Sequence, residues 1–279
     1  MITAPAPHSV ARSRARFSRS ASPSRWGEYR RLLQHAQAEG FEIRSLEAWL
    51  DNDRGERVLI LRHDVDQCPP AALRMLAIER DLGLKATWYL RWRTSRPRLV
   101  AAIRDAGGEL GLHYETLSRM VLAERAAGRE TDPAELVGAA QLALRRELIA
   151  FSVLFGPVRS ACAHGDTRVP GVNNAVLLRE ADMSEYQLEF DANASMQTHD
   201  LAVWLTDRSR AEGGWRDGLD ATEIISSHAS PVLLLTHPNN WVSGGGLWLD
   251  RISARVLSTP GPASQALRTS SDDPPVLAP

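Results

Sequence analysis

The segment of sequence that decides the fold is VLILRHDVD, residues 58–66. Its four opening aliphatic residues are typical of a strand that is buried on both faces, as in parallel α/β sheets. Burial disfavours charge, so His63, Asp64 and Asp66 at the end of such a strand need a metal ion or a catalytic role to account for them. The segment therefore predicts a parallel sheet and the position of a site at its edge.

Elsewhere in the chain, apolar runs suited to buried strands alternate with helical patterns, which is typical of a parallel α/β sheet or barrel. We expect helices over residues 26–38, 69–82, 97–106, 132–148 and 174–180, and strands over residues 58–62, 85–90, 109–112, 151–154, 160–163, 186–190, 202–205 and 232–235. Together these elements predict one ordered α/β domain over residues 27–257.

Composition limits the classes of partner. The 279 residues include 33 basic and 34 acidic side chains, so no overall charge favours nucleic acid or an anionic membrane surface. The Arg-, Ser- and Pro-rich residues 1–25 contain no apolar stretch long enough for a signal peptide or membrane span, and residues 258–279 are rich in proline. We expect both termini to be disordered, and the protein to be cytoplasmic and to bind a small ligand.

Four predicted strands end in a metal-competent or proton-transferring residue. Asp64 and Asp66 follow the first of these strands, and His113, His164 and His237 end the other three. The carboxyl ends of parallel strands meet at one face, so these side chains are expected to lie together. One carboxylate and two histidines suit zinc or a similar divalent ion, which leaves Asp64 and His237 as candidates for the base and the acid.

Each of these residues also has an ordinary structural interpretation. A histidine at a strand end is commonly a hydrogen-bonded structural residue, and an aspartate in the turn that follows is commonly a helix cap. Cys162 is a softer alternative ligand, because it lies two residues before His164 and so on the same face of a regular strand. The coincidence of several such residues at strand ends favours the metal site.

At this point the chain resembles the polysaccharide deacetylases with a NodB-homology domain, carbohydrate esterase family 4, and more closely their divergent HDVD-type relatives in polysaccharide and O-antigen biosynthesis. The resemblance rests on LRHDVD (61–66), ELGLHYE (109–115), ACAHGD (161–166) and LLTHP (234–238), in the family's order. It implies a distorted (β/α) barrel of about seven strands, a divalent metal ion, most simply Zn²⁺, and hydrolytic removal of an N- or O-acyl group from a sugar.

The chain departs from the family pattern at two positions. Val65 separates Asp64 from Asp66, whereas the family has adjacent aspartates, one serving as base and the other as ligand; the two roles are therefore exchangeable here. Four residues after His113, where the family has a second metal-binding histidine, this chain has Leu117. His164 is the expected replacement.

The resemblance then implies a division of roles. Asp66, His113 and His164 would hold the metal ion, Asp64 would accept a proton from water, and His237 would protonate the leaving group. Arg159 is expected to orient Asp64, as an arginine does in the family, or else to be a surface charge. Arg62 is expected to point away from His63 and receives no role, and His63 is expected to support a ligand.

Four residues are expected to contact the substrate, a saccharide or nucleotide-sugar: Trp241, Asn239, Tyr114 and Asp191. Trp241 follows His237 closely, and an indole suits stacking on a sugar ring, whereas Trp88 and Trp204 within strands are expected to be core residues. A turn is the alternative for Asp191. The alternative functions are an amidohydrolase or deformylase acting on a small non-sugar amide, and a non-catalytic sugar-binding barrel.

Overall fold

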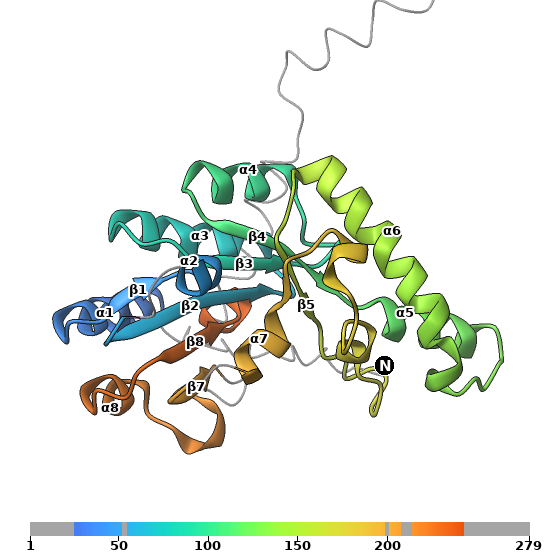
Figure 1. Cartoon of the computed structure of the whole chain (residues 1–279). Helices are drawn as coiled ribbons and strands as arrows, with labels where there is room; N and C mark the ends of the chain where they lie inside the picture. Colours follow the sequence, from blue (N-terminus) through green and yellow to red (C-terminus); the bar gives the residue numbers. More distant parts are fainter. Residues whose placement is uncertain (1–24, 52–54, 199–200, 208–213, 243–279) are drawn as a thin grey trace, which may run out of the picture.

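The computed structural model describes residues 25–51, 55–198, 201–207 and 214–242 (Figure 1). The expected disordered tail over 258–279, and all but the last residue of the expected disordered N-terminus, lie outside the described residues. Within the described part, no helix is long and apolar enough to cross a membrane.

Seven parallel strands form a curled half-barrel in the order β6-β5-β4-β3-β2-β8-β7, and β1 pairs with the first half of β2. The strands are β1 (Glu42–Arg44), β2 (Val58–Val65), β3 (Thr87–Leu90), β4 (Glu109–Tyr114), β5 (Ser160–Ala163), β6 (Phe190–Asp191), β7 (Val203–Thr206) and β8 (Val232–Thr236). This arrangement confirms the expected distorted (β/α) barrel of about seven strands.

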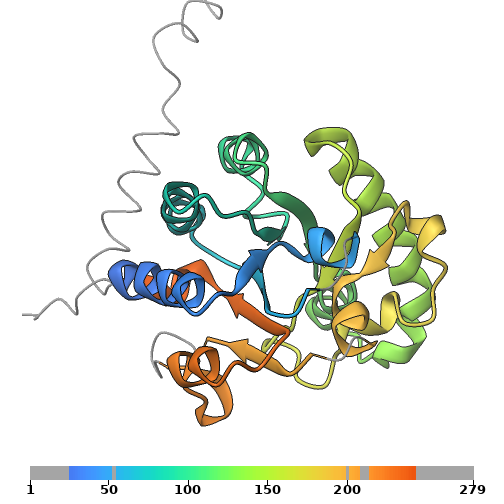
Figure 2. The ribbon, with the colours of Figure 1, turned by 60° about the vertical axis from the view of Figure 1, so that its left-hand side comes forward.

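Helices surround the strands, as Figure 2 shows. They are α1 (Trp26–Ala38), α2 (Leu46–Asp51), α3 (Pro69–Asp81), α4 (Pro97–Asp105), α5 (Thr116–Ala126), α6 (Val137–Phe155), α7 (Ala192–Thr198) and α8 (Ala221–Ser226), with short 3₁₀ turns η1 (Pro133–Leu136), η2 (Asn174–Leu177), η3 (Met183–Tyr186), η4 (Arg216–Gly218) and η5 (Pro238–Trp241). Prolines open α3 and α4, where the missing N–H costs nothing. The expected α1 has the bounds that the sequence indicated.

All eight residues of β2 are buried, and its two faces contribute to different cores. Leu59, Leu61 and Val65 belong to the large apolar core that the helices share with the sheet. Ile60 belongs to a smaller cluster with Trp49 of α2, inside the barrel. Because side chains alternate along a strand, the residues that follow Ile60 on its face are directed into the barrel interior.

Gly111 of β4 allows neighbouring strands to approach inside the barrel. A Cβ atom there would lie 2.4 Å from the ring of Tyr89 and 2.7 Å from the backbone oxygen of Ser160. The space is used instead by a 2.7 Å hydrogen bond between the Tyr89 hydroxyl and Ser160 Oγ. This glycine therefore maintains the packing beneath the strand ends.

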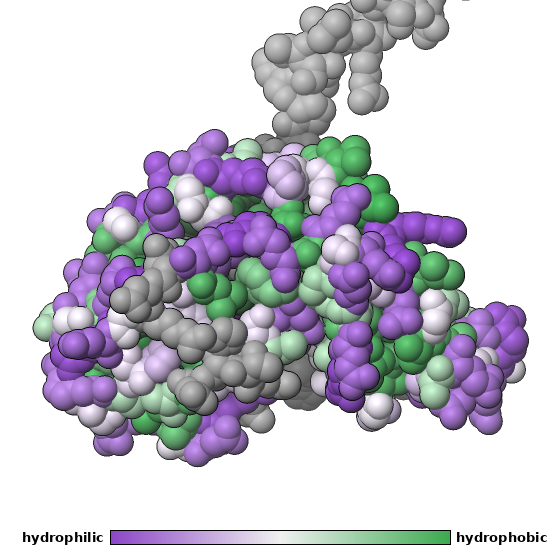
Figure 3. All heavy atoms as spheres, viewed as in Figure 1, coloured by the Kyte–Doolittle hydropathy of each residue, from purple (hydrophilic) through white to green (hydrophobic). Residues whose placement is uncertain are grey.

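The main error in the expected elements concerns residues 151–154, which form the end of α6 rather than a strand. Phe151 is buried but Val153 is 79% exposed, a difference that fits a helix with one buried face. The outer face of α6 carries exposed apolar side chains, which appear as green atoms over this helix in Figure 3. The expected strand over 186–190 is also shorter, because η3 extends to Tyr186 and β6 contains only Phe190 and Asp191.

Candidate functional site

The carboxyl ends of the strands surround a cavity of ≈ 1110 Å³. Its lining includes the expected chemical residues from four strand ends: Asp64, Asp66, His113, His164 and His237. The structure therefore brings these five sequence-predicted residues into one place.

Asp66, His113 and His164 present ligand atoms to a common point. Asp66 Oδ1 lies 3.4 Å from His113 Nε2 and 3.4 Å from His164 Nε2. Asp66 Oδ1 is also buried and has no hydrogen-bond partner in the part of the chain that the structure describes. Four ligands about 2.1 Å from a zinc ion in tetrahedral arrangement lie about 3.4 Å apart, so these separations and this unsatisfied oxygen fit a divalent ion.

The two histidines differ in what would make each of them able to bind a metal ion. His113 Nδ1 donates to the backbone oxygen of Cys162 at 3.0 Å, which leaves Nε2 facing Asp66. Burial lowers the pKa of His113, but the charge of Asp64 and the other groups around the ring outweigh burial, and the net effect is a raised pKa. The negative potential that raises this pKa also favours a bound cation. Burial and the nearby His113 lower the pKa of His164 to about 4, so His164 is neutral and its lone pair is available.

Arg62, not Arg159, holds the candidate base. Arg62 Nε and Nη2 donate to Asp64 Oδ1 and Oδ2 at 3.0 and 2.9 Å, because residues two apart on a strand share a face. Burial raises the pKa of Asp64, but Arg62 and His113 outweigh it and hold that pKa below its usual range. Asp64 Oδ2 lies 3.6 Å from His113 Nε2.

The expectation that Arg159 orients Asp64 is wrong. Arg159 donates to Asp51 at 2.6 and 2.7 Å and to Glu189 at 2.5 Å. Ser160 begins β5 at the opposite end of the strand from His164, so Arg159 lies at the far end of the barrel from the cavity. Its alternative interpretation as a surface charge is the one that the contacts support.

His237 is held by a residue that sequence reasoning missed. Its Nδ1 donates to Asp207 Oδ1 at 2.7 Å, and Asp207 Oδ2 accepts from the backbone N–H of His237 and from Trp241 Nε1 at 3.0 and 2.9 Å. Burial lowers the pKa of His237, but Asp207 outweighs it and raises that pKa above its ordinary value. The available signal was an aspartate directly after the apolar strand that contains Trp204.

His63 lies on the other face of β2 and is not part of this site. Its Nδ1 lies 2.7 Å from Thr236 Oγ1, and its Nε2 lies 2.8 Å from Glu79 Oε1, which also accepts from the Tyr29 hydroxyl at 2.6 Å. This network joins α1 and α3 to β2 and β8, between the helices and the sheet. The expectation that His63 supports a metal ligand is therefore wrong.

Three of the four expected substrate residues lie elsewhere. Trp241 is fully buried, and Tyr114 of β4 is buried in the large core. Asp191 accepts from the backbone N–H of Asn193 at 2.9 Å, which makes an Asx turn at the start of α7 and fits its alternative interpretation as a turn residue. Asn239 does line the cavity.

The prediction that Trp204 is a core residue is wrong. It was expected to be a core residue, but it lines the cavity and is 37% exposed. Trp204 and Thr206 share the inward face of β7, where Thr206 also lines the cavity. The indole therefore provides an apolar wall on the β7 side of the cavity.

Cys162 remains close to the site without matching the ligand pattern. Asp64, His113 and Cys162 form a second group whose ligand atoms lie within 4.8 Å of one another. Burial raises the pKa of the Cys162 thiol, and Arg62 Nη2 already contacts its sulfur. Because metal binding needs the thiolate, this group fits an ion less well than Asp66, His113 and His164.

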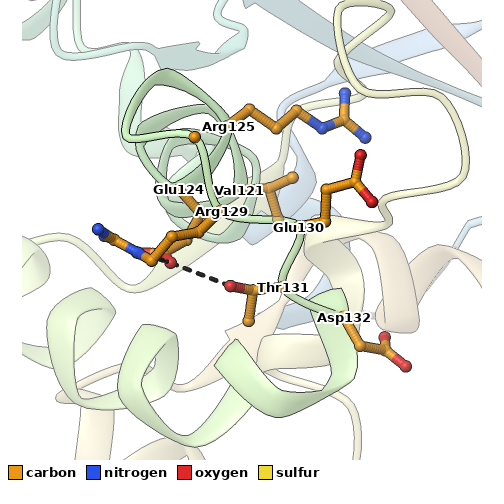
Figure 4. Close-up of a pocket in the computed structure, with 8 residues that line it drawn as sticks. Val121, Glu124, Arg125, Arg129, Glu130, Thr131 and Asp132 are labelled. Atoms are coloured by element: carbon orange, nitrogen blue, oxygen red, sulfur yellow. Dashed lines mark hydrogen bonds and ion pairs between the residues drawn. The ribbon is translucent and has the colours of Figure 1, made fainter.

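A second hollow, of ≈ 690 Å³, lies beside the C-terminal end of α5 (Figure 4). Glu124 is bonded there by Arg129 at 2.5 and 2.7 Å and by the Thr131 hydroxyl at 3.0 Å. Asp132 accepts from the backbone N–H of Ala134 at the start of η1. These local bonds account for the loop between α5 and η1 and indicate no ligand.

No protein-family model and no curated protein matches the sequence. Two solved structures are similar to this one: a CE4-family pseudoenzyme from Bacillus anthracis and a mutant of that protein with restored enzymatic activity. Each has a TM-score of 0.38 and 15% identity over 71% of this chain. The match spans 60% of the wild-type chain and 62% of the mutant chain.

Proposed function

We propose that this protein is a metal-dependent hydrolase that removes an N- or O-acyl group, most simply acetyl, from a saccharide or saccharide precursor. The observation that carries the proposal is the convergence of Asp66, His113 and His164 at the spacing of metal ligands. Asp64 and His237 line the same cavity, and each is held by a charged partner of its own.

A divalent ion bound to those three side chains would polarise an acyl carbonyl and lower the pKa of a water molecule. Asp64, fixed by Arg62, accepts the proton of the attacking water. Asp207 accepts from Nδ1 of His237 and raises the pKa of the imidazole, which favours the imidazolium form with a second proton on Nε2. That proton passes to the departing amine or hydroxyl group.

The cavity supports a substrate larger than a simple amide. Its ≈ 1110 Å³ slightly exceeds the volumes, about 300–1,000 Å³, that are typical of pockets for drug-sized ligands. Trp204 offers an indole surface on which a sugar ring can stack, and Asn239 offers an amide to its hydroxyl groups. These features favour a saccharide over a small non-sugar amide.

One observation favours the non-catalytic sugar-binding alternative. A carboxylate that accepts two hydrogen bonds from a buried arginine is a weak base, and Arg62 binds both oxygens of Asp64. The two candidates therefore differ in turnover rather than in metal or sugar binding.

The test is acyl release by the purified protein with Zn²⁺ supplied. Acetate and formate are measured after incubation with N-acetylated sugars, acetylated nucleotide-sugars, glycan oligomers and simple N-acyl amides. We expect acetate from at least one saccharide, and a loss of about 10²–10⁴ in kcat for Asp64→Asn, the range that general-base catalysis supplies.

His113→Ala removes a proposed ligand and is expected to weaken zinc binding strongly, leaving only residual binding to the other two side chains, and to abolish turnover. Asp182→Asn is the matched control, because this exposed aspartate only caps η3. Undiminished turnover in Asp64→Asn would exclude Asp64 as the base. Zinc binding without turnover on any substrate would favour the non-catalytic barrel.

A further inference from the structure

Glu115 lies directly after β4, two residues beyond the proposed ligand His113. Its side chain is 15% exposed, and its Oε2 lies 3.7 Å from His164 Nδ1. His164 Nδ1 is buried and has no hydrogen-bond partner among the described residues. Glu115 is therefore a carboxylate directed at the unused nitrogen of the other proposed histidine ligand.

Glu115 is itself held by ion pairs with arginine. Arg91, at the end of β3, makes an ion pair with Glu115 Oε2, and its side chain is only 4% exposed. Arg168 Nη2 lies 3.9 Å from the same oxygen. A buried arginine needs a carboxylate partner, so Arg91 and Glu115 stabilise each other beside His164.

We propose that Glu115 is a positioning residue for His164: it accepts the Nδ1 proton of the imidazole and so directs the Nε2 lone pair to the metal ion. This inference rests on the metal site of the proposed function. A neutral imidazole has one protonated and one unprotonated nitrogen, and the hydrogen bond made by the first determines which nitrogen can bind a metal. His113 meets the same need with the backbone oxygen of Cys162.

The geometry also explains how this chain builds its site without a histidine at position 117. The third ligand comes from β5, where the backbone N–H of His164 donates to the oxygen of Tyr114 at 2.8 Å and extends the ladder with β4. That pairing places His164 beside the end of β4, where Glu115 follows. One strand end thus supplies a ligand, His113, and the support for a second ligand.

A competing interpretation makes Glu115, His164 and Asp166 a metal site of their own, since their ligand atoms also lie within 4.8 Å of one another. Arg168 Nε and Nη2 already donate to Asp166 at 2.8 and 2.5 Å, and Arg91 is paired with Glu115. Two guanidinium groups at these carboxylates oppose a further cation there.

The experiment measures the dissociation constant of Zn²⁺ by chelator competition, and the number of ions bound, for the full chain and its variants. Glu115→Gln replaces the carboxylate by a neutral and weaker acceptor and is expected to weaken zinc binding about 10–100-fold, the usual effect of mutating the hydrogen-bond partner of a ligating histidine. Glu115→Asp keeps the negative charge but moves it away from His164 Nδ1, and it is expected to weaken zinc binding as well. This second variant tests the proposal even if Glu115→Gln fails to fold.

Glu147→Gln is the matched control. Its side chain is also 15% exposed and binds Arg119, but it has no contact with His164. We expect the dissociation constant of this variant to stay within twofold of wild type. Repeating Glu115→Gln in a His164→Ala background should remove its effect, because a residue that acts through His164 has no influence once that ligand is absent.

The results separate this inference from the proposed function. A wild-type protein that binds no zinc contradicts both. Wild-type zinc binding with unchanged affinity in both Glu115 variants, or an equal loss with and without His164, contradicts only the role of Glu115. Two ions per wild-type chain, one of them lost in Glu115→Gln, would establish the competing site instead.

Discussion

Arg62 and Asp64 form a buried ion pair at the base of the cavity, with side chains 2% and 6% exposed. The arginine also contacts Asn193 Oδ1 at 3.3 Å, and its guanidinium lies 4.9 Å from the centre of the Tyr89 ring. With this many partners, Arg62 fixes the direction of the Asp64 carboxylate. Removing it would leave a buried carboxylate without its main counter-charge.

We therefore expect Arg62→Met to lower the free energy of unfolding by about 3–5 kcal/mol at neutral pH, measured by urea denaturation. The pKa of Asp64 is depressed in the folded wild type, so its stabilisation is present above its unfolded pKa, about 4, and is lost as pH falls towards the folded pKa. The difference between wild type and variant should therefore shrink as the pH is lowered.

Arg159→Met is the control for this prediction. The partners of Arg159, Asp51 and Glu189, are about half exposed, so losing these pairs should cost about 0–1 kcal/mol. Equal losses in the two variants would contradict the role given to Arg62.

These two arginines show why the sequence predicts ligands better than their partners. Strand ends pointed to Asp66, His113 and His164 as candidate ligands, because the carboxyl ends of parallel strands lie on one face, and the structure brings these three side chains together. The partner of Asp64 depends on alternation along β2. The expected strand stopped at Arg62, whereas β2 continues to Val65 and places Arg62 and Asp64 on the same face.

At the scale of elements, the ends of β7 and β8 act as a pair. The two strands are parallel neighbours, with Thr206 opposite Leu235, so Asp207 and His237 leave them side by side. Trp241 of η5 donates to the same aspartate, and the centre of its ring lies 5.1 Å from the centre of the Tyr29 ring of α1. The candidate acid is thus fixed by two strands, a 3₁₀ turn and a helix.

Asp207→Asn is expected to lower the pKa of His237, because burial, which lowers that pKa, remains when the carboxylate that raises it is lost. In wild type the folded pKa is raised, so this interaction stabilises the protein fully below the unfolded pKa, about 6.5, and the stabilisation is lost as pH rises through the folded pKa. The stability difference between wild type and variant should accordingly be larger at pH 5.5 than at pH 9.

The measurement is NMR titration of the imidazole proton, with His237→Gln to assign the signal. The signal of His35, which contacts Ser226 on the outer surface, should be unaffected by Asp207→Asn and serves as the internal reference. An unchanged titration of His237 in Asp207→Asn would contradict the pairing.

The type of an element could be predicted where a local sequence pattern indicates it, and less well where contacts with other elements determine it. Prolines and periodicity identified α1, α3 and α4. The last turn of α6 resembled a strand because residues 151–154 are mostly apolar, a pattern that does not distinguish a short strand from a helix end. The three-residue β1 forms only because β2 pairs with it.

For the molecule as a whole, the proposed metal ligands join parts of the chain that are far apart in sequence. Asp66 follows β2, His113 lies near the end of β4, and His164 follows β5. The unfolded chain cannot hold these side chains together, so an ion that needs all three binds only the folded protein. Ion binding must then stabilise the whole half-barrel.

Zinc at about one hundred times its dissociation constant should therefore raise the free energy of unfolding by about 2.7 kcal/mol. For a domain of this size, that corresponds to an increase of roughly 5–10 °C in Tm, measured by calorimetry with and without a chelator. The double variant His113→Ala, His164→Ala is the control, and its Tm should not respond to zinc. An equal increase in that variant would place the ion elsewhere on the chain, and no increase in wild type would contradict a metal site at these strand ends.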